Sequence, residues 1–307
     1  RNGKILSNVK SSYKTGEGGI IPMDAARHHR ENKEKIYSES LLLSGIKEED
    51  IDAIAVSQGP GLAPCLLQGI GFAKELSEKL KRPIVPVNHC IAHLEIGRIT
   101  GAKDPVMLYA SGANTQIIAY ASEKFRVFGE TLDIGAGNFI DTFARYAGIG
   151  FPGGPEIEKL ATGTSRLIKL PYRVKGMDIA LSGILTNLKQ KLESGEYRLQ
   201  DLAFSLQETV FAMLVEVAER AMAHTEKKEL LLGGGVACNK RLQSMCRTMC
   251  EERGARFFCP ENQFLVDNAG MIAYLGEIMF KSGIKKNPGD VDIKPRERTD
   301  DVKVTWR

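Results

Sequence analysis

The stretch Pro105–Leu132, PVMLYASGANTQIIAYASEKFRVFGETL, decides the fold class because a strand-based pattern starts there for the second time. It predicts three strands joined by short turns, and the first turn is Ser111–Asn114 (SGAN). Segments with alternating strands and helices lie on both sides of it. Two related α/β lobes with a ligand-binding cleft between them are the expected architecture.

The residues before this stretch predict the order strand, helix, strand, helix. Ile51–Leu80 indicates a strand, a Gly-Pro-Gly turn and a helix, and Arg82–His89 indicates a strand that leads into the next helix. Further upstream, a strand over Lys4–Tyr13 and a helix of about 24 residues around residues 24–43 are predicted. The hairpin turn Asn2-Gly3 needs a strand in front of it, so we expect the natural protein to have a strand before Arg1.

The residues after it predict mainly helices. These are expected around residues 137–148, around 155–161, as a long pair through 200–225, and around 266–283. Lys228–Gly254 indicates a strand, a glycine loop and a helix, and Arg256–Pro260 indicates another strand.

The composition is that of an ordinary globular protein. The chain has 307 residues, of which 43% are hydrophobic, enough to fill two lobes. No apolar run approaches the roughly 18 residues that cross a bilayer and no leader opens the chain, so a cytoplasmic protein without a membrane partner is expected. The six cysteines follow no zinc-ribbon spacing and are expected to be reduced. The net charge of +4 does not demonstrate a nucleic-acid partner, although Lys281–Arg298 concentrates positive charge.

Two histidines four residues apart, in Asn88–Arg98 (NHCIAHLEIGR), are the first candidate ligands for a metal. On a helix, His89 and His93 share one face, so both imidazoles can reach one ion. A zinc protease needs Glu directly after the first His, and Cys90 stands there. Further ligands are left open: Asp267 would be structural if it caps the helix that follows it, and a tyrosine such as Tyr109 is ordinarily a half-buried strand residue.

Glycine-rich corners are the candidates for anion binding. They are residues 58–61 (QGPG), 111–114 (SGAN), 150–159 (GFPGGPEIEK) and 233–239 (GGGVACN). Their backbone N–H groups suit a phosphate or sugar, and the helix after residue 239 adds a favourable dipole. The alternative is that the glycines serve only tight turns. None is a P-loop or a dinucleotide-binding GxGxxG.

Six motifs in order closely resemble the universal tRNA threonylcarbamoyladenosine synthase family, in the form that is the catalytic subunit of the archaeal and eukaryal KEOPS complex. They are NHCIAHLEIGR, LYASGANTQ, GNFIDTFAR, GFPGGPEIEKLA, LLLGGGVACNKRL and DNAGMIA, and the likeness extends to the closing VTWR. The resemblance implies a two-lobed actin/hexokinase/Hsp70-like (ASKHA) α/β fold with a nucleotide and metal site between the lobes. We expect an N-terminal lobe over 1–104, a C-terminal lobe over 105–266, and a closing helix and tail over 267–307 that return toward the first lobe.

By its motifs, the resemblance also implies the site residues. One divalent ion, iron or zinc, would be bound by His89, His93, Tyr109 and Asp267. The pocket for an adenine nucleotide, threonylcarbamoyl-AMP, would be formed by Tyr109, Ala110, Ser111, Gly112, Ala113, Asp141, Gly154, Glu158 and Asn239.

The chain departs from the family pattern in two places. Ser111-Gly112-Ala113 stands where the family more usually has Ser-Gly-Gly, which adds a methyl group near the phosphate. The family's N-terminal strand and first phosphate loop are expected to lie before Arg1.

The activity implied is transfer of a threonylcarbamoyl group from its adenylate to N6 of the adenosine beside the anticodon of tRNAs reading codons that begin with A. The metal would act as template and Lewis acid. The partners implied are tRNA and KEOPS-type subunits, among them a small dimerising subunit and a small kinase-like ATPase that could be fused after Arg307. The basic segment 281–298 and the helix around 24–43 are both candidates for tRNA or partner contact.

Three other functions remain open from the residues. A metalloprotease lacks Glu at position 90, and a sugar kinase or ATPase of the same fold needs a catalytic Asp that the sequence does not identify. A noncatalytic nucleotide-binding scaffold is the third.

Overall fold

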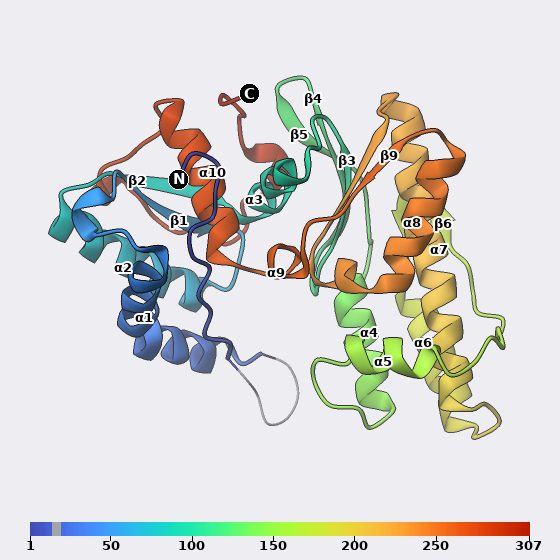
Figure 1. Cartoon of the computed structure of the whole chain (residues 1–307). Helices are drawn as coiled ribbons and strands as arrows, with labels where there is room; N and C mark the ends of the chain where they lie inside the picture. Colours follow the sequence, from blue (N-terminus) through green and yellow to red (C-terminus); the bar gives the residue numbers. More distant parts are fainter. Residues whose placement is uncertain (14–19) are drawn as a thin grey trace. The chain divides into compact units, whose positions relative to one another are not determined.

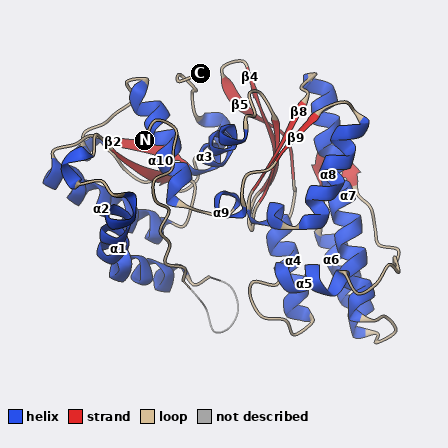
Figure 2. Cartoon of the chain, in the orientation of Figure 1, coloured by secondary structure: helices blue, strands red, loops and turns tan. Residues whose placement is uncertain are grey.

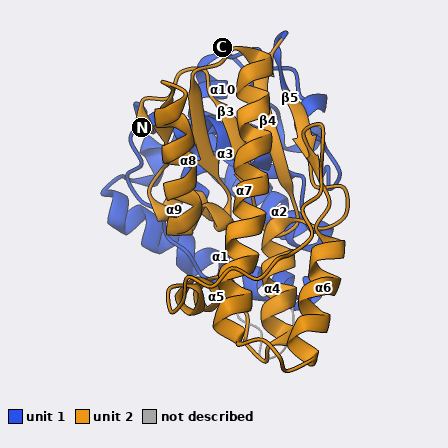
Figure 3. Cartoon of the chain, turned by 90° about the vertical axis from the view of Figure 1, so that its right-hand side faces the viewer, with its two compact units in different colours: residues 1–99, 122–125, 267–307 blue, residues 100–121, 126–266 orange. Residues whose placement is uncertain are grey.

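The computed structural model describes residues 1–13 and 20–307, and these divide into two compact units. Unit 1 comprises Arg1–Ile99, Ser122–Phe125 and Asp267–Arg307, and unit 2 comprises Thr100–Ala121 and Arg126–Val266 (Figure 3). Each unit has its own sheet covered by helices, as the α/β pattern of the sequence predicts (Figure 2). In the described part of the chain, no helix is both long and apolar enough to cross a membrane.

Unit 1 is built on a parallel pair of strands. Its elements are α1 (Pro22–Ser44), β1 (Ile54–Gly59), α2 (Ala63–Leu80), β2 (Ile84–Asn88), α3 (His89–Ile96) and α10 (Ala269–Lys281) (Figure 1). Every residue of β2 is buried, which fits a parallel strand covered on both faces. Helix α10 packs on β1, β2 and α3, and α2 packs on β1. A side chain at Gly276 would stand 2.3 Å from Ala55 Cβ, so this glycine lets α10 approach the sheet.

The N-terminal segment corrects one prediction. Lys4–Tyr13 has no regular secondary structure, because none of the described strands pairs with it and a strand needs a hydrogen-bonded neighbour. The predicted turn at Asn2-Gly3 is confirmed: both residues have positive φ, 55° and 75°, and the Lys4 N–H donates to the Arg1 carbonyl. Asn2 and Gly3 also donate their backbone N–H groups to the Glu277 carboxylate of α10.

Unit 2 is built on a mixed five-stranded sheet with strand order β5-β4-β3-β8-β9. These strands are β3 (Val106–Ala110), β4 (Thr115–Ala121), β5 (Lys124–Glu130), β8 (Glu229–Gly233) and β9 (Arg256–Phe258). The helices are α4 (Ala136–Tyr146), α5 (Gly154–Ala161), α6 (Ser182–Glu193), α7 (Leu199–Thr225), α8 (Lys240–Glu252) and α9 (Asn262–Leu265). The small hairpin of β6 (Val174–Lys175) and β7 (Asp178–Ile179) completes the set. Strand β3 is antiparallel to β4 and parallel to β8. The three strands predicted within residues 105–132 therefore share a sheet with a later strand-helix unit.

Helix α7 corrects the predicted pair of helices. It is one helix of 27 residues, because no glycine or proline interrupts it and its buried residues keep helical spacing along the whole length. Leu206, Val210, Leu214 and Val217 are among those buried in the core of unit 2. Helix α6 and the β6–β7 hairpin were not predicted; their segments are short and largely polar, so they give weak periodic signals.

Candidate functional site

Helix α3 positions the two histidines immediately after a buried strand. Asn88, the last residue of β2, caps the helix by accepting a hydrogen bond from the Ile91 N–H at 3.2 Å. His89 and His93 follow one turn apart, with ring centroids 4.9 Å apart. Their side chains are 21% and 1% exposed, so His93 is fixed by packing. The predicted helical face is present.

The Asp267 carboxylate brings a third ligand to the same point. Its Oδ1 lies 3.1 Å from His89 Nε2 and 3.2 Å from His93 Nε2. Nitrogen and oxygen ligands at about 2.0–2.2 Å from an ion stand roughly 3.0–3.4 Å apart, so these separations fit shared coordination. Burial lowers the pKa of His93, although Asp267 acts to raise it; a neutral imidazole is the form that binds a metal. The three residues therefore form a metal-binding group of suitable chemistry.

Asp267 lies two residues before the first residue of α10. Asn268 is the N-cap, because its Oδ1 accepts a hydrogen bond from the Met271 N–H at 2.8 Å. The structural alternative for Asp267, capping this helix, is therefore wrong. Its carboxylate is left to face the histidines.

Two side chains of α3 beside the histidines, those of Cys90 and Glu95, are not placed to act as a general base for peptide hydrolysis. Cys90 is buried, and burial raises the pKa of its thiol to about 11. Glu95, the carboxylate of α3, is fully buried and accepts hydrogen bonds from Arg98, Trp306 and Arg307. The Glu95 carboxylate is therefore occupied by these three donors. Neither Cys90 nor Glu95 resembles the catalytic Glu of a zinc protease.

Tyr109, the predicted fourth ligand, belongs to unit 2. It lies on β3, is 2% exposed, and pairs in register with Gln116 of β4 and Gly233 of β8. The structure brings the other three ligands together within unit 1, and a metal contact of Tyr109 stays a prediction.

The turn after β3 lies directly on the start of α4. Gly137 and Asn138 donate their N–H groups to the carbonyls of Ser111 and Gly112, at 3.0 and 2.9 Å. A side chain at Gly135 would come within 2.5 Å of the Ala113 carbonyl, so only glycine allows this approach. The predicted nucleotide residues 110–113 are thereby held against the start of α4, where the first N–H groups already donate to Thr115 Oγ1 and to the carbonyls of Ser111 and Gly112.

The loop after β8 reaches the same turn from the other side. Gly234 has a φ of 87°, and a side chain there would stand 2.4 Å from the Ala110 carbonyl oxygen. The close passage of two backbones is the reason for glycine. Residues 110–113 and 233–234, predicted separately, thus meet at the carboxyl ends of neighbouring parallel strands. Ligands of open α/β sheets bind at such edges.

The remaining predicted nucleotide residues make defined hydrogen bonds. Asp141 of α4 accepts from the Gly153 N–H at 2.8 Å, and burial raises the pKa of its carboxyl although the backbone donors of Gly153 and Gly154 oppose this. Glu158 of α5 accepts from the Lys240 N–H at 2.7 Å. The contact joins Glu158 to the start of α8, where Asn239 is the N-cap.

Asn239 connects the loop after β8 to the long helix α7. Its Oδ1 accepts from the Arg241 and Leu242 N–H groups, and its Nδ2 donates to Gln207 Oε1 at 2.9 Å. Gln207 was not predicted. It is a buried polar residue on an apolar helix face, and the sequence pattern alone could have marked it for this reason.

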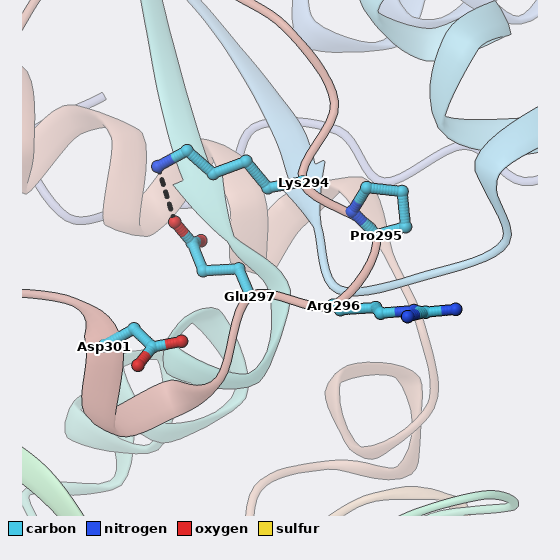
Figure 4. Close-up of a pocket in the computed structure, with 5 residues that line it drawn as sticks. All are labelled: Lys294, Pro295, Arg296, Glu297 and Asp301. Carbon is cyan, nitrogen blue, oxygen red and sulfur yellow. Dashed lines mark hydrogen bonds and ion pairs between the residues drawn. The ribbon is translucent and has the colours of Figure 1, made fainter.

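The QGPG corner serves packing of the C-terminal tail. A side chain at Gly59 would stand 1.9 Å from the Lys294 carbonyl, and the Gly61 N–H donates to the Pro295 carbonyl. Glu297, 7% exposed, accepts from Lys294 Nζ at 2.7 Å (Figure 4), from Asn88 Nδ2 at 3.0 Å and from Gln58 Nε2. These glycines are thus needed for close packing, and anion binding at residues 58–61 stays a prediction. Glu297 also was not predicted, since nothing in the sequence connects it to the residue before His89.

The two units and their sheets define a two-lobed α/β protein of the actin/hexokinase/Hsp70-like class. A solved structure of HypF from T. kodakarensis matches with a TM-score of 0.66 at 14% identity, over 81% of this chain and 43% of that one. At this identity the likeness concerns the fold alone.

The sequence comparisons give the family. Residues 4–274 match the model of TsaD, the tRNA N6-adenosine threonylcarbamoyltransferase family, and the chain belongs to this family. A tRNA N6-adenosine threonylcarbamoyltransferase from Thermococcus kodakarensis is 52% identical over 98% of this chain and 93% of its own length. A probable bifunctional tRNA threonylcarbamoyladenosine biosynthesis protein from Methanosarcina mazei is also 52% identical, over 99% of this chain and 56% of its own length. The predicted family is confirmed.

Proposed function

We propose that this chain transfers the threonylcarbamoyl group of threonylcarbamoyl-AMP to N6 of the adenosine beside the anticodon of tRNA, and that the transfer depends on a metal held by His89, His93 and Asp267. Family membership supports the transferase activity. The observation that supports the metal is the convergence of two imidazole nitrogens on one carboxylate oxygen at 3.1 and 3.2 Å. Tyr109 is the proposed fourth ligand.

An iron or zinc ion at this triad would supply Lewis acidity and a template for the threonylcarbamoyl group. The residues of the chain set up that role. His93 is rigid and neutral because it is buried, and Asn88 fixes the start of α3 so that both imidazoles point at Asp267. In the reaction the N6 amine attacks the carbamoyl carbon, a C–N bond forms, the bond to the AMP phosphate oxygen breaks, and N6 loses a proton.

The proposed adenylate site lies on unit 2, at residues 109–113 with Asp141, Gly154, Glu158 and Asn239. Two backbone segments meet there at the carboxyl ends of the parallel strands β3 and β8, the edge of an α/β sheet where ligands bind, and this supports placing the AMP leaving group there. Ala113, in place of the glycine more usual in the family, lies in the same turn. We expect its methyl group to narrow the approach without blocking it.

The proposed partners are tRNA and KEOPS-type subunits. The Methanosarcina mazei relative is named bifunctional, and the chain spans about half of its length. This supports a second activity, which we propose is a small kinase-like ATPase, acting beside the transferase in relatives of this kind. We expect the proteins to act in the cytoplasm.

The test supplies labelled threonine, bicarbonate, ATP, an enzyme that makes the adenylate, partner subunits and tRNA, and follows label into tRNA. We expect metal-dependent incorporation by the parent and none by His93→Ala. His224→Ala is the matched control, because His224 is an exposed histidine at the end of α7 and should keep full activity. Incorporation by His93→Ala equal to that of the metal-loaded parent, or full incorporation by a parent stripped of metal, would contradict the metal role. Peptide cleavage without incorporation would contradict the transferase.

A further inference from the structure

The basic C-terminal segment and the turn after α2 form one cationic pocket in unit 1. Its volume is about 790 Å³, and it is lined by Ser77, Lys81, Arg82, Pro83, Lys285, Lys286, Asn287, Pro288 and Asp290. The two segments are about 200 residues apart in the sequence and are joined by an isolated bridge between Ile84 and Lys286. Four cations therefore surround one carboxylate.

The charges of this pocket are not neutralised by neighbouring acids. Lys79 pairs with Glu48 at 2.7 Å and Lys281 with Glu277 at 2.6 Å, just outside the pocket. Among the described residues, by contrast, no ion pair joins a carboxylate to Lys81, Lys285 or Lys286. The Arg82 guanidinium donates to a backbone carbonyl, that of Glu49. Such a cluster repels itself unless an anion binds to it.

The backbone holds the cations in place. Lys81 is the left-handed C-cap of α2, with a φ of 53°, and the Ser77 hydroxyl donates to the Arg82 carbonyl. On the other side, the Lys286 N–H and carbonyl both bond to Ile84, at 2.8 and 3.0 Å. Both segments are therefore fixed at the start of β2, and the pocket is preformed.

We propose that this pocket binds the phosphate backbone of the tRNA substrate. Lysine and arginine side chains around an open groove are the usual contacts to phosphate, and they confer affinity without reading sequence. That the RNA is tRNA rests on the proposed function. Of the two candidates for tRNA contact in the sequence, the basic segment and helix α1, the basic segment is the one that contributes to this pocket.

The position of the pocket within unit 1 fits a substrate larger than one nucleotide. It lies at the beginning of β2, whereas His89 follows the end of the same five-residue strand. Five residues of strand span roughly 16 Å, about the rise of five nucleotides in one strand of a duplex. The pocket and the triad thus lie at opposite ends of one buried strand, a separation that a single tRNA can bridge and a mononucleotide cannot.

The test measures tRNA binding by the full chain, without chemistry. Fluorescence anisotropy with labelled tRNA compares the parent with the triple variant Lys81→Ala, Lys285→Ala, Lys286→Ala between about 50 and 200 mM salt. We expect the Kd to rise about tenfold or more, and the slope of log K against log salt to become shallower by nearly 3 (about 0.9 for each of three lost phosphate contacts). The matched control is Lys103→Ala, Lys169→Ala, Lys175→Ala, three exposed lysines of unit 2, for which less than about a twofold change is expected.

An unchanged Kd and slope in the pocket variant, or an equal loss in the control, would overturn the proposal. A second outcome would also overturn the proposal: inorganic phosphate raises the melting temperature of the parent but not of the lysine variant, while the variant binds tRNA as the parent does. The pocket would then be a site for a small anion. His93→Ala separates this inference from the proposed function: it should bind tRNA like the parent and lose transfer. If neither the parent nor any variant transfers label, but the lysine variant still binds tRNA more weakly than the parent, the proposed function is wrong and the tRNA-binding pocket is supported.

Discussion

The metal triad of unit 1 and the glycine loops of unit 2 are assembled by different means. The triad consists of side chains: His89 and Asp267 are 178 positions apart and meet only through their Nε2 and Oδ1 atoms. The loops consist of backbone: residues 110–113 touch Gly135 and Gly234 so closely that a single added carbon would overlap a carbonyl. The first arrangement can lose a ligand with little change of fold, and the second cannot lose a glycine without moving a strand.

Removal of both histidines of the triad should have the largest effect, a loss of metal binding in unit 1. For His89→Ala with His93→Ala we expect metal affinity to fall by more than the roughly 10–100-fold that loss of a hydrogen bond to a ligand costs, because two ligands are gone. Elemental analysis after reconstitution with iron or zinc measures this. The double variant His28→Ala, His29→Ala on α1 is the control and should keep full stoichiometry. Unchanged metal in the first variant would remove the triad as a metal site.

On the unit 2 side, Gly234→Ala should leave metal binding intact and destabilise the fold. With φ 87° and ψ 162°, Gly234 has a backbone conformation essentially confined to glycine, which costs a residue with a side chain about 1–3 kcal/mol; the contact with the Ala110 carbonyl adds to it, so we expect a loss of about 3 kcal/mol. Urea unfolding measures the loss. Gly254→Ala is the control for a positive φ alone: its φ is 63°, and an added side chain meets no atom within 4 Å, so a smaller loss is expected. Equal losses in the two variants would show that close approach of the backbones contributes nothing.

Glu297→Ala tests whether the triad depends on its supporting residues. Removal of this carboxylate leaves the amides of Gln58 and Asn88, both nearly buried, without an acceptor, which should cost about 1–2 kcal/mol. Because Asn88 caps α3, we also expect metal affinity to fall by about tenfold. Isothermal titration with zinc measures this, and Glu261→Ala, an exposed acid beside α9 in unit 2, should change neither property. Normal metal affinity in a destabilised Glu297→Ala protein would make Glu297 a purely structural residue.

The sequence predicted local features of both sites better than their connections. The H-x3-H spacing placed His89 and His93 on one helical face, and the glycines marked the corners at 111–114 and 233–239, because helical periodicity and turn chemistry are local properties. That Asp267 meets the histidines came only from family resemblance, since no spacing links residues so distant. Glu297 was not predicted for the same reason, whereas Gln207 was missed although a polar residue on an apolar helix face is a local signal. The strand over Lys4–Tyr13 failed because alternation alone does not supply a pairing partner.

Two carboxylates that hold backbone turns, one in each unit, give the smallest expected effect. In unit 1, Glu277 accepts from the Asn2 and Gly3 N–H groups and from Lys281. In unit 2, Asp133 accepts from the Leu181 and Ser182 N–H groups. Although burial opposes it, this bonding lowers the pKa of Glu277 to about 2 and also lowers the pKa of Asp133.

A carboxyl group whose pKa is depressed in the folded state stabilises the protein fully above its unfolded pKa, and that contribution is lost as the pH falls through the folded pKa. For Glu277 the window runs from 4.5 down to about 2, and we expect a loss of about 1 kcal/mol across it because the side chain is partly solvated. Glu277→Gln should lack this component of acid sensitivity, and Asp133→Asn should lack its own, in urea unfolding at a series of pH values. If only one of the two variants flattens the pH dependence, acid destabilisation begins in the unit that contains the altered carboxylate. If both retain the full dependence of the parent, neither turn contributes, and the acid sensitivity of the two units must come from other groups.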